Sequence, residues 1–241
     1  MLPAVTAAEM ADVDKLALAR GLELLQMMEN AGALLARLVH HRFPAASRVL
    51  VLAGPGGNGG GALVAARRLA GFGYEVMVIP MTGMAQLTPV AAHQARLLER
   101  ISAVSWWPGK HPEAGLPEAL TKDDVIIDGI LGYSVRGAPH GAAAQWILAA
   151  NRHPAPKVAL DVPSGLNPDD GTTAGEAIRA HTSLTLALPK QGLLSESARP
   201  WIGDLALGDI GIPSAWVADA VSRITPTTWY EAGDLTWLAL R

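Results

Sequence analysis

A glycine-rich run, Gly54-Pro-Gly-Gly-Asn-Gly-Gly-Gly61, is the first stretch of this sequence whose residue types suit ligand binding. Glycines let backbone N–H groups approach an anion, and a helix that starts at such a run adds the positive end of its dipole. The run matches the Gly-x-Gly-x-x-Gly pattern of dinucleotide-binding proteins but lacks the Lys-Ser/Thr pair of a P-loop. Residues 78–82, at the end of the next apolar segment, also lack the carboxylate that binds ribose. An ordinary NAD(P) dehydrogenase is therefore disfavoured, and a tight turn without a ligand is the alternative.

Two carboxylates close apolar segments further along the chain. Asp128 ends the segment 125–128, and Asp161 ends the segment 158–161. If these segments are neighbouring parallel strands, both carboxylates face one crevice beyond the carboxyl ends of the strands, where open α/β sheets bind ligands. A carboxylate positioned there is suited to proton transfer. The alternative is that each aspartate only caps the turn that follows it.

A third group of polar residues could supply oxygen ligands. Asn58, Asp128 and Ser164 carry the hard oxygen donors that group I and II cations prefer. Ser164 stands in Pro-Ser-Gly rather than in Gly-x-Ser-x-Gly, so a hydrolase nucleophile is not indicated. The histidines are scattered without metal-ligand spacing, and the absence of cysteine excludes thiolate metal sites and disulfides. Arg136 is either a phosphate contact or a solvated loop charge.

The composition indicates a compact globular protein. Of the 241 residues, 50% are hydrophobic and 17% are charged, and the net charge is −3. No basic block is present, so a nucleic-acid partner is not expected. The glycine run interrupts the longest uncharged stretch, residues 49–66, and a spanning helix does not tolerate such an interruption. The N-terminal residues do not resemble a signal peptide. We therefore expect a soluble, cytoplasmic protein that does not bind membranes.

Strand and helix patterns alternate along the chain. Residues 6–42 have helical periodicity, and Gly21 is expected to separate two helices there. The expected strands are residues 48–53, 75–80, 104–106, 125–128, 158–161 and 184–188, with 204–211 as a late strand. The expected helices after the glycine run are residues 62–69, 87–100 and 141–150. This alternation predicts a single α/β domain over residues 1–241, with a mostly parallel central sheet and helices on both faces.

Several motifs in register resemble the YjeF N-terminal domain family, the NAD(P)H-hydrate epimerases. They are Met28-Glu-Asn-Ala-Gly32, the glycine run followed by Ala65-Ala-Arg67, Asp128 with its Leu-Gly-Tyr-Ser loop, Asp161-Val-Pro-Ser-Gly-Leu166, Pro189-Lys-Gln-Gly-Leu193 and Gly208-Asp-Ile-Gly-Ile-Pro213. The resemblance runs from about residue 6 to residue 215. It implies a Rossmann-like three-layer sandwich with N-terminal helices, a homodimer, and a repair reaction. That reaction interconverts the R and S epimers of hydrated NADH or NADPH at C6 of the nicotinamide ring, so that an S-specific dehydratase can use both.

The resemblance also implies roles for individual residues. Asp161 is the implied catalytic acid or base. A potassium ion is the implied cofactor, held by Asn58, Asp128 and Ser164. The implied substrate-binding residues are Gly57, Asn58, Gly59, Gly60, Gly61, Gly132, Tyr133, Ser134, Val135, Arg136, Gly137, Ala138 and Asp161.

The chain departs from the family pattern in the glycine run. The family loop reads Gly-x-Asn-Asn-Gly-Gly-Asp-Gly, whereas Gly57 and Gly61 stand here in place of the first Asn and of the Asp. The missing carboxylate keeps a noncatalytic nucleotide-binding or regulatory module as the alternative, while the strand-end aspartates favour the epimerase. Residues 225–241 resemble the linker into the ADP- or ATP-dependent dehydratase domain of two-domain members. A fused or associated dehydratase is therefore an expected partner.

Overall fold

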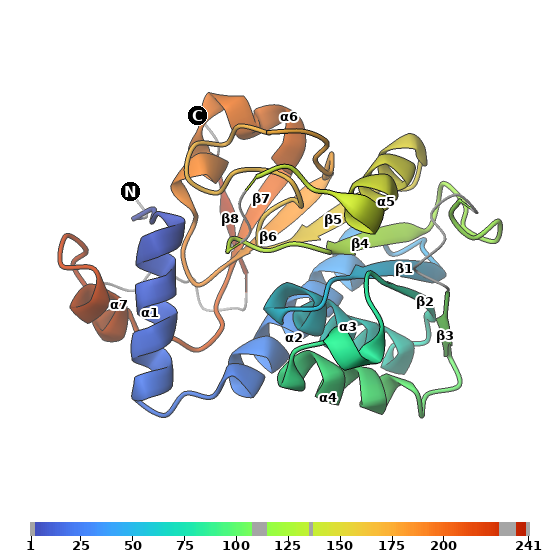
Figure 1. Ribbon diagram of the computed structural model, residues 1–241, viewed down its shortest axis with the longest axis horizontal. Coiled ribbons are helices and arrows are strands. Elements are labelled where there is room, and N and C mark those ends of the chain that lie inside the picture. Colours follow the sequence, from blue (N-terminus) through green and yellow to red (C-terminus); the bar gives the residue numbers. More distant parts are fainter. Residues whose placement is uncertain (1–2, 108–114, 135–136, 227–234, 240–241) are drawn as a thin grey trace.

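The computed structural model describes residues 3–107, 115–134, 137–226 and 235–239 (Figure 1). Within these residues, eight strands form one sheet in the order β3-β2-β1-β4-β5-β6-β7-β8. Neighbouring strands are parallel except for β7 and β8, which are antiparallel. The strands are β1 (Arg48–Ala53), β2 (Glu75–Pro80), β3 (Val104–Trp106), β4 (Val125–Gly129), β5 (Lys157–Leu160), β6 (Thr182–Leu186), β7 (Asp204–Gly208) and β8 (Leu235–Leu238).

Helices cover both faces of the sheet, as Figure 1 shows. The helices of the described residues are α1 (Ala7–Ala19), α2 (Leu24–Arg42), α3 (Gly57–Gly71), α4 (Pro89–Leu98), α5 (Gly141–Arg152), α6 (Arg199–Ile202) and α7 (Ser214–Ala220). Val49 and Val51 of β1 pack with α2, α3 and α4, whereas Leu50 and Leu52 pack with α5. This alternation follows from the two-residue period of a strand. The predicted three-layer α/β fold is confirmed.

The first two helices are separated where the sequence predicts. Thr6 caps α1 by accepting a hydrogen bond from the backbone N–H of Glu9, whose carboxylate accepts one from Thr6 in return. Gly21 has φ +92°, a conformation that favours glycine, and it lies between α1 and α2. α1 does not lie on the sheet but packs beside α7 at the left of Figure 1, so it projects as a separate wall.

Several predicted boundaries were wrong. α3 begins at Gly57 rather than at residue 62, because the second half of the glycine run forms the first turn of the helix. β6 begins at Thr182 rather than at residue 184, since Thr182 and Ser183 pair with β7, and it ends before Ala187, where φ is +59°. β7 ends at Gly208 because residues 209–211 form a turn in which Gly211 N donates to Asp209.

Part of the predicted linker belongs to the sheet. Within residues 225–241, the described residues 235–238 form β8, which pairs with β7. Residues 227–234 and 240–241 lie outside the described part, and a following dehydratase domain stays a prediction. No helix of the described residues is long and apolar enough to cross a membrane.

Candidate functional site

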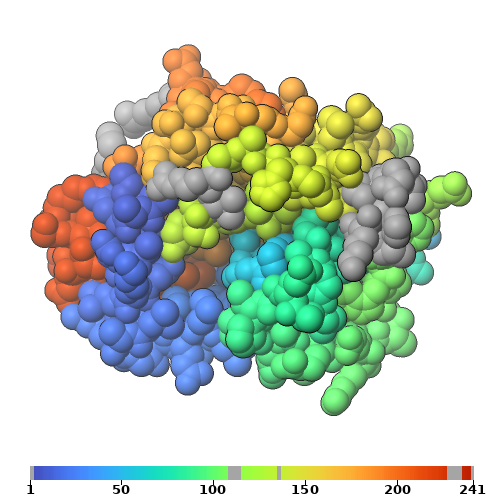
Figure 2. All heavy atoms as spheres, in the orientation of Figure 1, coloured from blue at the N-terminus to red at the C-terminus, as the bar shows by residue number. Residues whose placement is uncertain are grey.

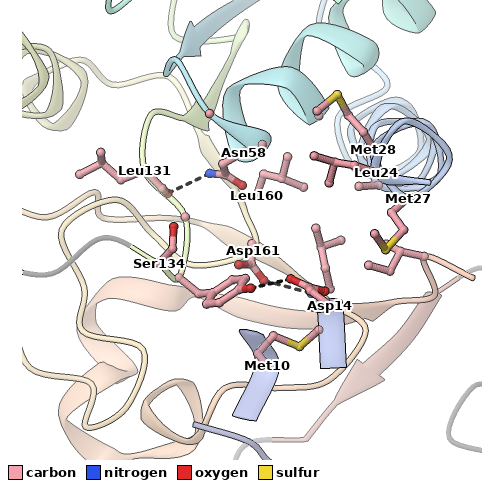
Figure 3. Close-up of a pocket in the computed structure, with 18 of the residues that line it drawn as sticks. Met10, Asp14, Leu24, Met27, Met28, Asn58, Leu131, Ser134, Leu160 and Asp161 are labelled. Atoms are coloured by element: carbon pink, nitrogen blue, oxygen red, sulfur yellow. Dashed lines mark hydrogen bonds between the residues drawn. The ribbon is translucent and has the colours of Figure 1, made fainter. Parts of the chain in front are cut away.

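A cavity of about 410 Å³ lies beyond the carboxyl ends of β1, β4 and β5. In Figure 2 the surface is hollowed between α1, in dark blue, and the cyan start of α3. One wall comes from α1 and α2 and is apolar except for Asp14, whereas the other carries the polar groups of the strand-end loops (Figure 3). The apolar wall includes Met10, Leu18, Leu24, Met27, Met28 and Ala31. This position is the one at which open α/β sheets bind ligands.

The glycine run contributes backbone to the cavity at the start of α3. Gly57, Asn58 and Gly61 line the cavity, whereas Gly59 and Gly60 do not. A Cβ on Gly59 would lie 1.9 Å from the carbonyl oxygen of Gly54, and one on Gly60 would lie 2.4 Å from Met28 Cε. Gly59 is therefore required for packing because backbone cannot move aside, whereas at Gly60 only the tip of the Met28 side chain would have to shift. Of the five residues of this run predicted to bind substrate, Gly57, Asn58 and Gly61 line the cavity.

Asp161 reaches the cavity because the chain leaves the strand geometry at this residue. Its φ of +66° is rare for a residue other than glycine and is typical of functional sites. Asp161 Oδ1 lies 2.5 Å from Lys190 Nζ, and the two side chains are only 6% and 1% exposed. Lys190 also donates to the carbonyl oxygen of Leu186 at 2.9 Å. The cavity thus holds a buried carboxylate whose charge is compensated by a buried ammonium group.

Asp128 lies behind the cavity instead of in its wall. β4 and β5 are neighbours, as expected, but the prediction that both carboxylates face one crevice was wrong. Regular alternation in β4 keeps Asp128 on the face of Ile126, which packs with Trp146 of α5. Asp128 is fully buried, and its carboxylate accepts hydrogen bonds from the N–H of Ile130 and from both the N–H and the hydroxyl of Ser164. Burial raises the pKa of Asp128 to about 6.

The three predicted metal-binding residues meet around Leu131. Asn58 Nδ2 donates to the carbonyl oxygen of Leu131 at 2.8 Å, as Figure 3 shows. The hydroxyl of Ser164 accepts from the N–H of Leu131 at 2.9 Å and donates to Asp128 Oδ1 at 2.6 Å. Ser164 also lines a smaller cavity of about 170 Å³ beside the main one. The structure therefore brings Asn58, Asp128 and Ser164 together around one backbone segment, with Asn58 at the main cavity, Ser164 at the smaller one and Asp128 buried behind them.

The loop after β4 is divided between the two cavities. Gly132, Tyr133 and Ser134 line the main cavity, and Gly137 lines the smaller one. Ala138 is exposed and lines neither. Val135 and Arg136, predicted to bind substrate, lie outside the described residues.

Sequence reasoning gave no role to two side chains of the site. Lys190 belongs to the motif Pro189-Lys-Gln-Gly-Leu193, but its ion pair joins it to Asp161, which is far away in the sequence. No local sequence pattern therefore indicates this pair. Asp14 of α1 lines the cavity, and its Oδ2 accepts a hydrogen bond of 2.5 Å from the hydroxyl of Tyr133. The sequence does contain a signal for Asp14. This acidic residue lies one helical turn from the buried Met10, on the face of α1 where helical periodicity predicts apolar residues.

Comparisons with known proteins identify similar chains. The family described as YjeF-related protein N-terminus matches residues 24–192. An NAD(P)H-hydrate epimerase of Dehalogenimonas lykanthroporepellens is 42% identical over 215 residues, which are 88% of this chain and 83% of that protein. A bifunctional NAD(P)H-hydrate repair enzyme Nnr of Thermosynechococcus vestitus is 38% identical over 98% of this chain, which spans only 45% of that protein. The crystal structure of yeast YNL200c superposes with a TM-score of 0.79 at 26% identity, over 98% of this chain and 100% of that chain.

Proposed function

The chain belongs to the YjeF N-terminal domain family, and from this premise we propose that it is an NAD(P)H-hydrate epimerase. It interconverts the R and S forms of hydrated NADH and NADPH at C6 of the nicotinamide ring. The observation that carries the proposal is the buried Asp161–Lys190 pair in the wall of a cavity that also contains the start of α3. A module that only binds nucleotides has no need of a buried ion pair at this place, so this alternative is less well supported.

The cavity suits the two chemically different parts of the substrate. The first turn of a helix has backbone N–H groups without intrahelical partners, and at the start of α3 these suit the negative charge of a pyrophosphate. Gly57 and Asn58 lie in this turn and line the cavity. The apolar wall from α1 and α2 suits the flat face of a ring.

Asp161 is the residue to which we assign proton transfer. Inversion at C6 requires the hydroxyl to take up a proton and leave as water, while the lone pair of the ring nitrogen forms a C=N bond. Water then adds to the other face of the planar carbon and loses a proton, which restores the lone pair. No electrons are lost or gained by the substrate, so the reaction needs acid–base groups and no redox partner. A positioned carboxylate contributes about 10²–10⁴-fold to such a step.

Potassium is the cation that we propose for the group around Asp128. A fully buried carboxylate is costly unless its charge is compensated, and no lysine or arginine of the described residues forms an ion pair with Asp128. No cluster of three or more His, Cys, Asp or Glu side chains is present among the described residues, so a site here would consist of neutral oxygens and one carboxylate. Asn58, Asp128 and Ser164 supply such a set, and the ion would compensate the charge of Asp128.

The homodimer, the fused or associated dehydratase and the cytoplasmic location stay predictions. The chain spans less than half the length of the bifunctional repair enzymes that it matches, which supports a fused or associated dehydratase as its partner. The homodimer and the cytoplasmic location follow from the family resemblance and the sequence pattern alone.

The test of the proposed function is the rate at which purified R-epimer NADPH hydrate approaches equilibrium. The epimers are separated by chromatography in potassium buffer, with a blank that contains no protein because they also interconvert spontaneously. We expect the protein to accelerate the approach and Asp161→Asn to lose that acceleration, so that its rate is that of the blank. Asp123→Asn, an exposed aspartate, is the matched control and keeps the full rate. A folded wild-type protein with the rate of the blank would instead favour the binding module.

A further inference from the structure

A second carboxylate, Asp14, faces the cavity from α1. Asp14 lies one helical turn after Met10 and one before Leu18, and all three line the cavity. Residues four apart share a face of a helix, so this stripe of α1 is the one turned to the ligand. The other acidic residues of α1, Glu9 and Asp12, are bound in ion pairs with basic side chains away from the cavity. Asp14 is therefore placed to contact a ligand.

The carboxyl group of Asp14 is held at one oxygen and open at the other. Tyr133 donates its hydroxyl hydrogen to Asp14 Oδ2 at 2.5 Å. Within the described residues, no hydrogen bond to Asp14 Oδ1 is present, so this oxygen is available to a ligand. Burial raises the pKa of Asp14, while the hydrogen bond from Tyr133 and the charge of Lys190 act in the opposite direction. The group therefore keeps its proton to a higher pH than an exposed aspartate.

Asp14 and Asp161 have contrasting surroundings within one cavity. Asp161 lies against the ammonium group of Lys190, which compensates a negative charge. Asp14 is half-buried beside Met10, and among the residues that the structure describes its side chain is bound only by the neutral hydroxyl of Tyr133. One carboxyl group of the cavity is thus paired with a cation, whereas the other is bound to a neutral hydroxyl, and two carboxyl groups in such different surroundings can take different roles in one reaction.

We propose that Asp14 is a second acid–base residue of the site and that Tyr133 positions its carboxyl group. The inference rests on the proposed epimerase function. In one direction Asp14 gives its proton to the hydroxyl, and the C6–O electrons leave with the resulting water as the ring nitrogen forms the C=N bond. Asp161 then takes the proton of the water that adds to the other face. The reverse direction exchanges the two roles, and solvent returns the proton between turnovers.

The charged and titratable groups around Asp14 come from several elements. Tyr133 follows β4, Asp161 follows β5, and Lys190 follows β6. The charge of Asp161 raises the pKa of Asp14, whereas the charge of Lys190 lowers it. On α7, which packs against α1, Asp219 is paired with Arg20. The pKa of Asp14 is therefore set by groups within the cavity.

The kinetic test compares Asp14→Asn with the wild type and with Asp12→Asn, an exposed neighbour on the same helix. We expect Asp14→Asn to lower kcat by about 10²-fold or more, with KM changed by less than about threefold, because the lost proton transfer acts in the transition state. Asp12→Asn keeps the wild-type values. Circular dichroism checks that each variant folds.

The pH profile separates catalysis from a supporting role. Asp14 must carry its proton to act as the acid, so kcat/KM falls as pH rises and Asp14 loses that proton. Tyr133→Phe removes a hydrogen bond that stabilises the carboxylate. The pKa of Asp14 then rises further, and the alkaline limb of the profile moves to higher pH. In Asp14→Asn the alkaline decrease of kcat/KM disappears. If Asp14 only supported the fold, the substitution would leave the pH of this decrease unchanged.

Each outcome decides the inference. A wild-type kcat and an unshifted alkaline limb in Asp14→Asn, with Asp161→Asn at the rate of the blank, overturn the inference and leave the proposed function intact. Wild-type protein at the rate of the blank overturns both. If Asp14→Asn does not fold, the limb of Tyr133→Phe decides: a shift to higher pH supports the inference, and an unshifted limb overturns it.

Discussion

Asp128 and Asp161 occupy the same place in the strand pattern, at the ends of two neighbouring parallel strands, but their surroundings differ. Asp128 is fully buried and is held by Ser164 and by the N–H of Ile130. Asp161 reaches the cavity, where Lys190 compensates its charge. A strand end therefore determines where a carboxylate lies along the sheet, but the local backbone and the nearest counter-charge determine its chemistry.

The backbone explains why the two side chains diverge. β4 runs regularly to Gly129, so Asp128 keeps the alternation of its strand and faces α5. β5 ends at Leu160, and Asp161, the next residue, has a φ of +66°. Its side chain therefore departs from the alternation of the strand. We therefore expect changes near Asp161 to affect both activity and stability, and changes near Asp128 to affect mainly stability and its response to pH and potassium.

Removal of the counter-charge of Asp161 should have the largest effect. Lys190→Met leaves a buried carboxylate without its partner, which costs about 3–5 kcal/mol in the free energy of unfolding. We also expect the epimerisation rate to fall to that of the blank. Urea unfolding and the chromatographic assay measure the two effects. Lys15→Met, which breaks an exposed pair with Asp12, is the control and should change stability by less than about 1 kcal/mol. Equal stabilities for both variants would contradict the assigned importance of the buried pair.

The close packing between the ends of β1 and β4 can be tested at Gly54. A Cβ at this position would lie 1.9 Å from the backbone oxygen of Ile130, and backbone cannot move aside as a side chain tip can. We expect Gly54→Ala to lower the free energy of unfolding by about 3 kcal/mol. Gly57→Ala, whose added Cβ meets nothing within 4 Å, is the matched control and should be close to neutral. Similar unfolding midpoints for the two variants would show that the strand ends are less tightly packed than described here.

The pH dependence of stability should distinguish Asp128 from an ordinary aspartate. Burial raises its pKa from the usual 3.8 to about 6. Because the raised value belongs to the folded state, the stabilising contribution is complete below pH 3.8 and is lost as pH rises to about 6. This shift corresponds to a loss of about 3 kcal/mol without a bound cation. The difference in unfolding free energy between the wild type and Asp128→Asn, measured from pH 4 to pH 7, isolates this group.

Potassium provides a second condition for the same comparison. A cation bound at Asp128 stabilises the carboxylate, so wild-type protein should lose less stability with rising pH in potassium than in choline buffer. Asp128→Asn should show no such difference. An identical pH dependence of the wild type in both buffers would contradict a potassium site at this residue.

Ser164 should give the smallest of the expected effects. Its hydroxyl donates to Asp128 Oδ1 at 2.6 Å and accepts from the N–H of Leu131 at 2.9 Å. Ser164→Ala removes both contacts and should cost about 2 kcal/mol in thermal or urea unfolding. Ser105→Ala, which removes an exposed hydroxyl 3.4 Å from the carbonyl oxygen of Val76, should change stability by less than about 0.5 kcal/mol.

Much of the fold is encoded in local patterns and was therefore predictable. The apolar runs of β1 and β4 are buried on both faces, and Gly21 separates the first two helices at the expected place. β8 is an exception, because its Leu-Thr-Trp-Leu sequence alternates weakly and its position depends on pairing with β7. The start of α3 was also missed, since glycine has a low helix propensity and only tertiary packing keeps residues 57–61 helical.

The candidate site was predictable where it follows strand ends and not where distant segments meet. Asp161 was identified because it closes a strand, and the structure places it in the cavity. The Lys190 contact joins residues far apart in the sequence, so no spacing rule could reveal it. Asp14 reaches the site from α1, whose position beside α7 is a tertiary feature. The alternation of β4 puts Asp128 on the same face as Ile126, but the sequence does not show that α5 covers this face. The burial of Asp128 was therefore not predictable.

The most direct test of this account measures the epimerisation of R-epimer NADPH hydrate by Asp161→Asn and Asp128→Asn side by side in potassium buffer. Both variants are isosteric, and both must first be shown to fold. We predict that Asp161→Asn has the rate of the protein-free blank, whereas Asp128→Asn, which changes a residue outside the cavity wall, stays clearly above it. Activity close to that of the wild type in Asp161→Asn, with loss of activity confined to Asp128→Asn, would contradict the account.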